Sequence, residues 1–176
     1  NHKKFNWLIT QTKVNYHFLC EEMAGSEQGG SDYDKALRLC LEGLSKYRDL
    51  DFDGAIKDLK KSLILIGDDD EETYKLFGHL GSVYFAKKQY EEALVYQKKA
   101  MQTLKKLGNA NPEELRGTFH NMSQTYKKLR EYEKAVKCFH EEIKLIGKDH
   151  TDVCSIYREI GDAYRLWRRD DQACNF

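Results

Sequence analysis

One spaced pattern recurs along this chain and restricts the folds open to it. A small residue is followed three positions later by a tyrosine, and then by an aromatic residue and an alanine. Two copies lie 42 residues apart: Gly81, Tyr84, Tyr90 and Ala93, and then Ser123, Tyr126, Tyr132 and Ala135. A fixed period of this length is typical of folds that stack one supersecondary unit on the next.

Two further copies extend the pattern in both directions. The later copy follows at an offset of 38 residues and consists of Tyr157, Ile160, Gly161, Tyr164 and Ala173. The earlier copy matches residues 52–55 to residues 90–93 at the same offset, and Tyr47 fills the place of Tyr84 if its turn is one residue shorter. The offsets differ by four residues, about one helical turn, which leaves an apolar face unrotated. A difference of one helical turn between the two offsets favours helices over strands in the repeats.

Helices are predicted throughout the repeats because apolar residues recur there at steps of three and four. Asn111 before Pro112 is a typical helix start, and the glycines at 67, 108 and 147 follow apolar runs as helix ends do. The predicted helices cover residues 33–48, 52–66, 71–87, 90–106, 112–129, 132–146 and 151–168, with a stub from residue 170.

These helices predict an all-α protein, an α-solenoid of about three and a half helix hairpins with an extra N-terminal helix. Residues 1–24 carry an apolar stripe and are predicted to form that flanking helix, and residues 25–32 read as a flexible linker. The array spans residues 33–176, divided into 33–66, 71–106, 112–146 and an incomplete unit at 151–176. Because the chain lacks an initial Met and stops early in a second helix, we expect it to be a piece of a longer protein.

Composition restricts the partners and the compartment. Lys and Arg number 29, as do Asp and Glu, so the basic excess typical of nucleic-acid binders is missing. No apolar run approaches the ~18 residues of a membrane span. We therefore expect neither a nucleic acid nor a membrane as partner. The five cysteines form no CxxC pair and no signal peptide is visible, so we expect an intracellular protein, cytoplasmic or nuclear, with reduced thiols.

Motifs that carry chemistry are missing from the sequence. His140-Glu141 begins like a zinc-binding helix but lacks the second histidine one turn later. The acidic run at residues 68–72 lacks the ligand spacing of a calcium loop, and acidic residues are favourable at a helix start. Neither a phosphate loop nor a nucleophile elbow is present. We predict no catalytic residue, no metal site, no cofactor and no enzyme activity.

The small residue, tyrosine, aromatic and alanine resemble the tetratricopeptide repeat (TPR) over about residues 33–176. The 42-residue period resembles the long repeats of kinesin light chain and related adaptors. Residues 147–153 are similar to the stretch that opens light-chain repeats, with Thr151 in place of proline. The resemblance implies a non-catalytic scaffold or adaptor whose first helices line a concave groove for a partner peptide. The alternative is an architectural subunit that docks through its convex face and its ends.

Exposed polar positions on the predicted first helices are the candidate contacts with a partner. They are Lys75, His79, Ser82, His120, Asn121, Gln124, Lys127, Lys128, Arg158, Asp162 and Arg165. Asn121 aligns with the asparagine that holds the ligand main chain in peptide-binding repeats, where an amide can both donate and accept. His79 and Glu159 occupy its place in the flanking repeats. The lysines and arginines from residue 127 onward predict an acidic or carboxylate-bearing peptide.

Overall fold

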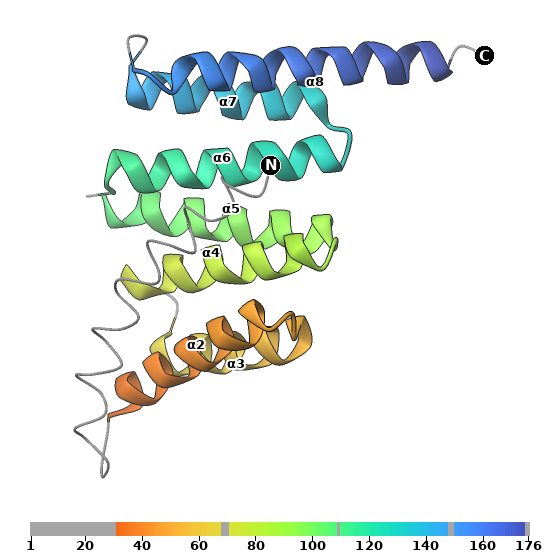
Figure 1. Ribbon diagram of the computed structural model, residues 1–176. Helices are drawn as coiled ribbons and strands as arrows, with labels where there is room; N and C mark the ends of the chain where they lie inside the picture. Colours follow the sequence, from red (N-terminus) through yellow and green to blue (C-terminus); the bar gives the residue numbers. More distant parts are fainter. Residues whose placement is uncertain (1–30, 68–70, 109, 148–149, 175–176) are drawn as a thin grey trace.

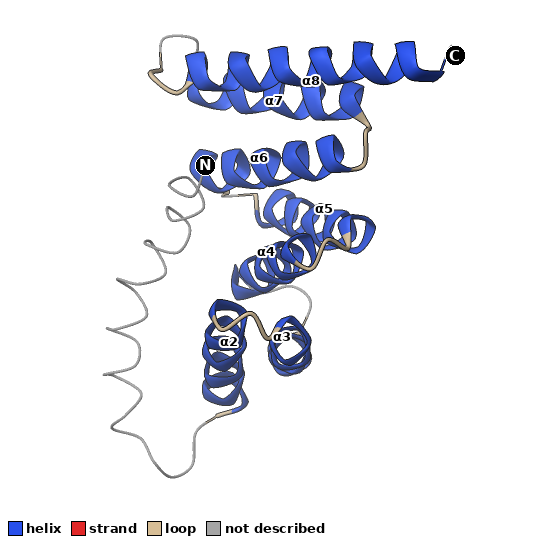
Figure 2. Cartoon of the chain, turned by 45° about the vertical axis from the view of Figure 1, so that its right-hand side comes forward, coloured by secondary structure: helices blue, strands red, loops and turns tan. Residues whose placement is uncertain are grey.

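Seven helices make up the part of the chain that the structure describes. The computed structural model describes residues 31–67, 71–108, 110–147 and 150–174, and these ranges contain no strand (Figure 1, Figure 2). The helices are α2 (Asp32–Arg48), α3 (Phe52–Ile66), α4 (Glu71–Ala86), α5 (Tyr90–Leu107), α6 (Pro112–Lys128), α7 (Tyr132–Ile146) and α8 (Val153–Cys174). The predicted flanking helix at 1–24 and most of the linker lie outside the described residues. Ser31 and Asp32, assigned above to the linker, instead cap and begin α2.

Consecutive helices pair into hairpins, and the hairpins stack along one direction. The pairs are α2 with α3, α4 with α5, and α6 with α7, and each pair contacts the next. Figure 1 shows the stack running from α2 and α3 at one end to α7 and α8 at the other. Helix α8 packs on α7 and has no hairpin partner among the described helices. This confirms the prediction of an all-α solenoid of three and a half hairpins.

The predicted helix start at Asn111 is confirmed as a capping box. The backbone N–H of Glu113 donates to Oδ1 of Asn111 over 3.0 Å, and the N–H of Asn111 donates to Oε2 of Glu114 over 3.3 Å. Pro112 occupies the first helical position, where a missing N–H costs nothing. The three predicted terminal glycines have φ angles of 87°, 68° and 79°, the region that glycine enters without strain: Gly67, Gly108 and Gly147.

The turn inside each hairpin has the same geometry three times. Leu50, Lys88 and Arg130 adopt left-handed φ angles of 64°, 65° and 61°. The next N–H closes the turn over 2.9 Å in every case: Asp51 to the carbonyl of Lys46, Gln89 to that of Tyr84, and Glu131 to that of Tyr126. This 6→1 bond is the Schellman ending of a helix.

The repeated turn corrects the register predicted for the first hairpin. Because Lys46 accepts the bond that Tyr84 accepts in the second hairpin, the turn is not one residue shorter. Tyr47 therefore matches Phe85 rather than Tyr84. Its ring packs on Phe52 at 6.1 Å between centroids, as the ring of Phe85 packs on Tyr90 at 5.4 Å.

Small residues set the distance between the two helices of a hairpin. A Cβ added to Gly81 would lie 2.9 Å from Cγ of Gln97 and 3.4 Å from the carbonyl oxygen of Ala93 on α5. Gly43 occupies the equivalent place on α2 and faces α3, where its Cβ would lie 3.0 Å from Cγ of Leu59. Such contacts leave no room for a side chain at these positions, since protein interiors are close-packed.

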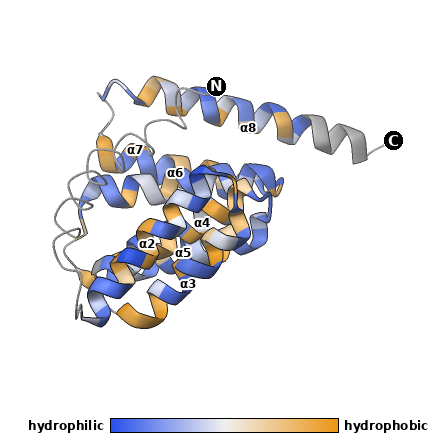
Figure 3. Cartoon of the chain, turned by 60° about the horizontal axis from the view of Figure 1, so that its bottom comes forward, coloured by the Kyte–Doolittle hydropathy of each residue, from blue (hydrophilic) through white to orange (hydrophobic). Residues whose placement is uncertain are grey.

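Two hydrophobic cores run through the stack and meet at α5. One contains residues of α3 and α4 together with Ala93, and the other contains Leu94 and Met101 together with residues of α6, α7 and α8. Each helix shows apolar and polar residues on different sides (Figure 3). Adjacent residues of α5 therefore belong to different cores.

Helix α8 differs from the sequence-based prediction. A turn was expected after residue 168 with a second helix from 170, but α8 runs unbroken to Cys174. Arg168 holds the place of the left-handed Lys88 and Arg130 yet stays helical. Asp170 stands where Tyr90 supplies the aromatic residue in the second hairpin, and neither glycine nor proline interrupts the segment. The helix consequently projects past α7 (Figure 1).

The described helices differ from membrane-spanning helices in length or in hydropathy. None of them combines the length and the apolar character needed to cross a membrane.

Replacing Gly81 with leucine is expected to destabilise the array, because the side chain would separate α4 from α5. We expect the free energy of unfolding to fall by about 1–3 kcal/mol. Gly78→Leu is the matched control on the same helix, where a Cβ meets nothing within 4 Å. Urea denaturation followed by circular dichroism measures both variants. Equal losses at the two positions would contradict the close-approach role of Gly81.

Candidate functional site

The first helices of the hairpins follow one another along one side of the stack. Helix α2 contacts α4, and α4 contacts α6. The hydroxyl of Tyr74 on α4 bonds the carboxylate of Glu114 on α6, and Lys127 on α6 reaches Glu159 on α8. Helices α2, α4, α6 and α8 therefore form a row of first helices, and the predicted contact residues are on α4, α6 and α8.

Glu159 joins α6 to α8. Its Oε2 accepts from Nζ of Lys127 over 2.7 Å and from Nε2 of Gln124 over 3.3 Å. Burial alone would raise the pKa of Glu159, but the hydrogen bond and charge of Lys127, together with the hydrogen bond from Gln124 and the nearby His120, hold this pKa below its ordinary value. Lys127 and Gln124 were predicted as ligand contacts, and in the structure both bind Glu159. Lys127 keeps only 15% of its side chain exposed.

His120 and Arg116 form two further connections. Nδ1 of His120 lies 3.2 Å from Oε2 of Glu142 on α7, and the Glu142 side chain is almost fully buried. Arg116 places Nη1 3.2 Å from Oδ2 of Asp152, just before α8. His120, which was predicted as a ligand contact, links α6 to α7 within the third hairpin.

Two of the three predicted contacts on α4 also have local partners. Nζ of Lys75 bonds Oε1 of Glu72 over 2.6 Å, and Oγ of Ser82 donates to the carbonyl of Gly78 over 3.0 Å. Desolvation lowers the pKa of His79 to about 4. The imidazole of His79 is therefore neutral at physiological pH and can offer one donor and one acceptor but no charge.

Three predicted contacts on α6 and α8 keep their polar groups uncommitted. The side chains of Asn121, Lys128 and Arg158 make no hydrogen bond or ion pair with any residue the structure describes. Asn121 is half-buried, whereas Lys128 and Arg158 are exposed. Arg165 is 77% exposed but bonds its neighbour Asp162 over 3.0 Å. The positive charge expected along α6 and α8 is thus partly neutralised within the protein.

The described residues offer little for metal or thiol chemistry. Across the four described ranges, no group of three or more His, Cys, Asp or Glu side chains is arranged to hold a metal ion. Burial raises the pKa of Cys40 to about 12 and that of Cys138 to about 11. Both thiols are therefore protonated and poorly nucleophilic at neutral pH.

Sequence reasoning missed the carboxylates that hold the row together. Glu114, Glu142 and Asp152 were not singled out, and Glu159 was noted only as the residue in the place of Asn121. The available signal was weak: an acidic residue at a position that is alanine or asparagine in another copy. Such a substitution marks Glu142, which stands where Ala100 stands in the second hairpin, but it does not identify the partner.

Part of the chain matches a known protein family, and its fold resembles that of several solved structures. Residues 72–141 match the family model described as tetratricopeptide repeat, and no curated protein matches the chain. The N-terminal domain of stress-induced protein-1 (STI-1) from C. elegans is similar, with a TM-score of 0.63 and 17% identity over 77% of this chain and 99% of that one. MamA is similar at a TM-score of 0.60 and 19% identity, over 80% of this chain and 72% of that one.

A third similar structure contains a bound peptide. It is the first TPR of Spaghetti (RPAP3) bound to the HSP90 peptide SRMEEVD, with a TM-score of 0.59 and 20% identity over 77% of this chain and 97% of that one. At identities this low, the three structures establish the fold that this chain shares with them.

The free energy of unfolding is expected to decrease as the pH is lowered, because His79 has a lowered pKa in the folded protein. An unfolded histidine has a pKa near 6.5, and the folded pKa is about 4, so the unfolded state binds more protons between these values. The contribution is complete above about pH 6.5 and is lost as the pH falls toward 4, with a slope of up to about 1.4 kcal/mol per pH unit. Urea denaturation at several pH values measures the slope. His79→Asn should flatten it, and an unchanged slope would contradict the assignment.

The pKa of Glu159 is expected to rise when Lys127 loses its charge. Lys127→Met removes the hydrogen bond and the cation that lower this pKa, which leaves the opposing effect of burial. A titration of the Glu159 carboxyl carbon by NMR measures the change. Lys128→Met is the matched control, since Lys128 is exposed, and an equal shift in both variants would show that Lys127 is not the partner.

Proposed function

Since this chain is a tetratricopeptide-repeat protein, we propose that it is a protein-interaction scaffold that binds a linear segment of a partner across its row of first helices. The solenoid presents an extended surface of the kind that repeat proteins use for binding. The proposed role is binding rather than catalysis, in the cytoplasm or another intracellular compartment, in keeping with the free cysteines at 40, 138 and 154.

The observation that carries the proposal is the cross-linking of the first helices by their own side chains. Tyr74 with Glu114, Lys127 with Glu159, and Arg116 with Asp152 connect successive hairpins. A row fixed in this way loses little conformational entropy when a ligand docks, so most of the ordering cost falls on the peptide. The surface of the first helices is therefore preorganised for an extended, flexible ligand.

Asn121 is the proposed main-chain contact. Its side-chain amide is half-buried on α6 and uncommitted among the described residues. An amide offers one acceptor and two donors, which matches the N–H and C=O of a peptide backbone. Contact with backbone groups would make this part of the binding independent of the ligand's side chains.

The proposed ligand is acidic or carries a carboxylate at the bound end. Lys128 and Arg158 keep their charge uncompensated among the described residues, whereas Lys127 and Arg165 are paired with Glu159 and Asp162. The structurally similar domain of RPAP3 is bound to the peptide SRMEEVD, which ends in Glu, Glu, Val and Asp. A charge-assisted bond from arginine to a carboxylate is stronger than a neutral one.

Peptide binding is expected to depend on Asn121 and Arg158 in different ways. The probes are fluorescently labelled SRMEEVD and its counterpart SRMKKVK, measured by anisotropy. Asn121→Ala should lower the affinity for the acidic peptide by about tenfold, because hydrogen bonds to the peptide main chain are lost. Arg158→Glu should lower the affinity for SRMEEVD by at least about tenfold. The ratio of the affinities for SRMEEVD and SRMKKVK should fall as well.

The control makes the same change of charge on a second helix. Lys57→Glu alters an exposed position of α3 and should leave both affinities unchanged. A preference for SRMKKVK would overturn the proposed sign of the ligand. Equal losses from Lys57→Glu and Arg158→Glu would show a long-range charge effect rather than a contact on the first helices.

A further inference from the structure

The carboxylate of Glu159 engages two hydrogen-bond donors of α6 at once. Nζ of Lys127 and Nε2 of Gln124 both donate to its Oε2, over 2.7 Å and 3.3 Å. The two donors are neighbours on α6, because residues three apart in a helix lie on the same face. The other oxygen, Oε1, makes no hydrogen bond with any residue the structure describes. A cation and an amide that converge on one carboxylate could hold the carboxylate of a ligand in the same way.

This contact lies among the residues proposed to bind a peptide. Glu159 has the place on α8 that Asn121 has on α6, since the repeats are offset here by 38 residues. Lys128 follows Lys127 directly, and Arg158 precedes Glu159 directly; these two cations are the ones proposed to bind an acidic ligand. The side chain of Glu159 is 32% exposed, so a peptide on the first helices can reach it from solvent.

The packing of α8 on the third hairpin does not depend on Glu159 alone. Four apolar residues of α8 are buried in the core that also contains residues of α6 and α7: Val153, Ile156, Ile160 and Ala163. Arg116 on α6 also reaches Asp152 over 3.2 Å. A partly exposed ion pair adds little to such contacts. The charge of Glu159 can therefore be removed while α8 stays packed on α7.

We propose that Glu159 is a specificity-determining residue whose carboxylate occupies Lys127 and Gln124 and keeps ligand carboxylates away from them, a role that rests on the proposed peptide binding. A ligand carboxylate directed at Lys127 has to displace Glu159 or lie beside it, and like charges brought together oppose binding. The acidic groups of the ligand are therefore left to Lys128 and Arg158. The part of the ligand that lies over Glu159 carries no negative charge.

A repulsive contact of this kind selects among ligands, because specificity is a difference of affinities. A peptide with acidic residues along its whole length would bring one of them against Glu159. A peptide whose acidic residues are confined to one end can place them at Lys128 and Arg158 and avoid that contact. The row of first helices therefore favours a ligand with its negative charge at one end.

A purely structural role for Glu159 predicts a different result from its replacement. If the carboxylate serves only to join α6 to α8, its removal loosens the first helices, and the affinity for an acidic peptide falls or stays the same. If the carboxylate excludes those of a ligand, its removal frees Lys127, and the same affinity rises. The direction of the change in affinity therefore separates the two roles.

The test measures the binding of labelled SRMEEVD to the wild type and to Glu159→Gln by fluorescence anisotropy. Glutamine keeps the size of the side chain and removes its charge. Because a neutral amide accepts from lysine less strongly than a carboxylate does, a ligand carboxylate can replace it at Lys127. We expect the affinity for SRMEEVD to rise at least about tenfold, and the affinity for SRMKKVK to fall or stay the same.

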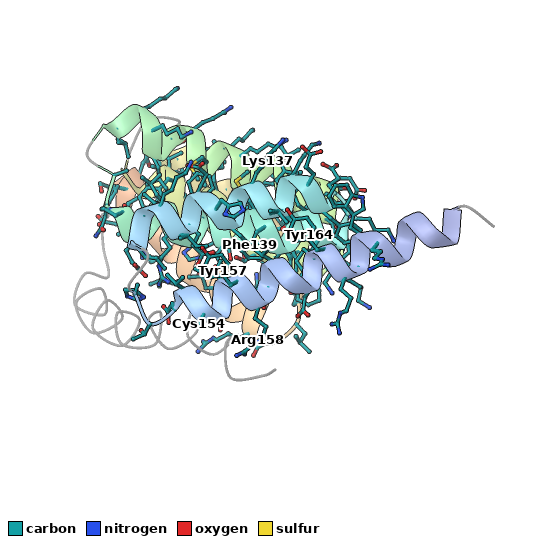
Figure 4. The ribbon with its side chains drawn as sticks, turned by 90° about the horizontal axis from the view of Figure 1, so that it is seen from above. Lys137, Phe139, Cys154, Tyr157, Arg158 and Tyr164 are labelled. Atoms are coloured by element: carbon teal, nitrogen blue, oxygen red, sulfur yellow. The ribbon has the colours of Figure 1, made fainter. Side chains whose placement is uncertain are left out.

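The matched control removes the same charge from α7. Glu133 holds Nζ of Lys137 over 2.6 Å, so Glu133→Gln also frees a lysine. Figure 4 looks onto α7 and α8 from the end of the stack and shows Lys137 and Arg158 on opposite sides of this helix pair. Glu133→Gln should therefore leave the affinity for SRMEEVD unchanged.

Two further variants separate a freed lysine from a loosened α8. Asp152→Asn breaks the ion pair with Arg116 without freeing Lys127, and it should not raise the affinity for SRMEEVD. Lys127→Met in the Glu159→Gln background removes the cation that the ligand would reach. It should cancel the gain in affinity, because two residues in contact have effects that do not add.

Three results would overturn the proposal: no gain in affinity with Glu159→Gln, an equal gain with Asp152→Asn, or a gain that Lys127→Met leaves intact. In each case SRMEEVD still binds, so the proposed function would stand.

Absence of SRMEEVD binding to both the wild type and Glu159→Gln would instead count against the proposed peptide binding. Sodium acetate then tests Glu159 by itself. Acetate should shift the NMR signals of the Lys127 side chain in Glu159→Gln and not in the wild type. Equal shifts in the two proteins, or none in either, would overturn the role of Glu159.

Discussion

The close approach of two helices at a small residue is the contact on which the rest of the array depends. Gly43 and Gly81 bring a second helix so near that only backbone and slender side chains fit between. The aromatic residues beside them, such as Tyr84, are buried as a result. Each hairpin then offers an apolar side to the next one. On α8 the equivalent positions are Gly161 and Tyr164, and no other described helix packs against them.

Several charged side chains of the first helices form ion pairs within the array. Lys127, Arg116 and His120 each face a carboxylate of a neighbouring element, so their recognition capacity is largely used in holding the hairpins in register. Among the predicted contacts on α6 and α8, the amide of Asn121 and the cations of Lys128 and Arg158 have no partner in the described residues. Recognition by so few groups favours a short ligand segment whose main chain contributes much of the binding.

The sequence predicted the helices well because their signals are local. The bounds of α3 and α7 agree with prediction, since apolar periodicity and a terminal glycine define each. The register of Tyr47 was missed because an aromatic residue was matched by type, whereas backbone hydrogen bonds align Lys46 with Tyr84. The pairing of Lys127 with Glu159 could not be predicted either. It depends on how far one hairpin is displaced relative to the next, and a single sequence does not define that displacement.

The division of the apolar interior at α5 has a mechanical consequence. Ala93 belongs to one core and Leu94 to the other. A pulling force applied to the ends of the chain would therefore pass from one core to the other through α5. Neighbouring units of a solenoid contact only one another, and force would therefore peel hairpins away in sequence from an end.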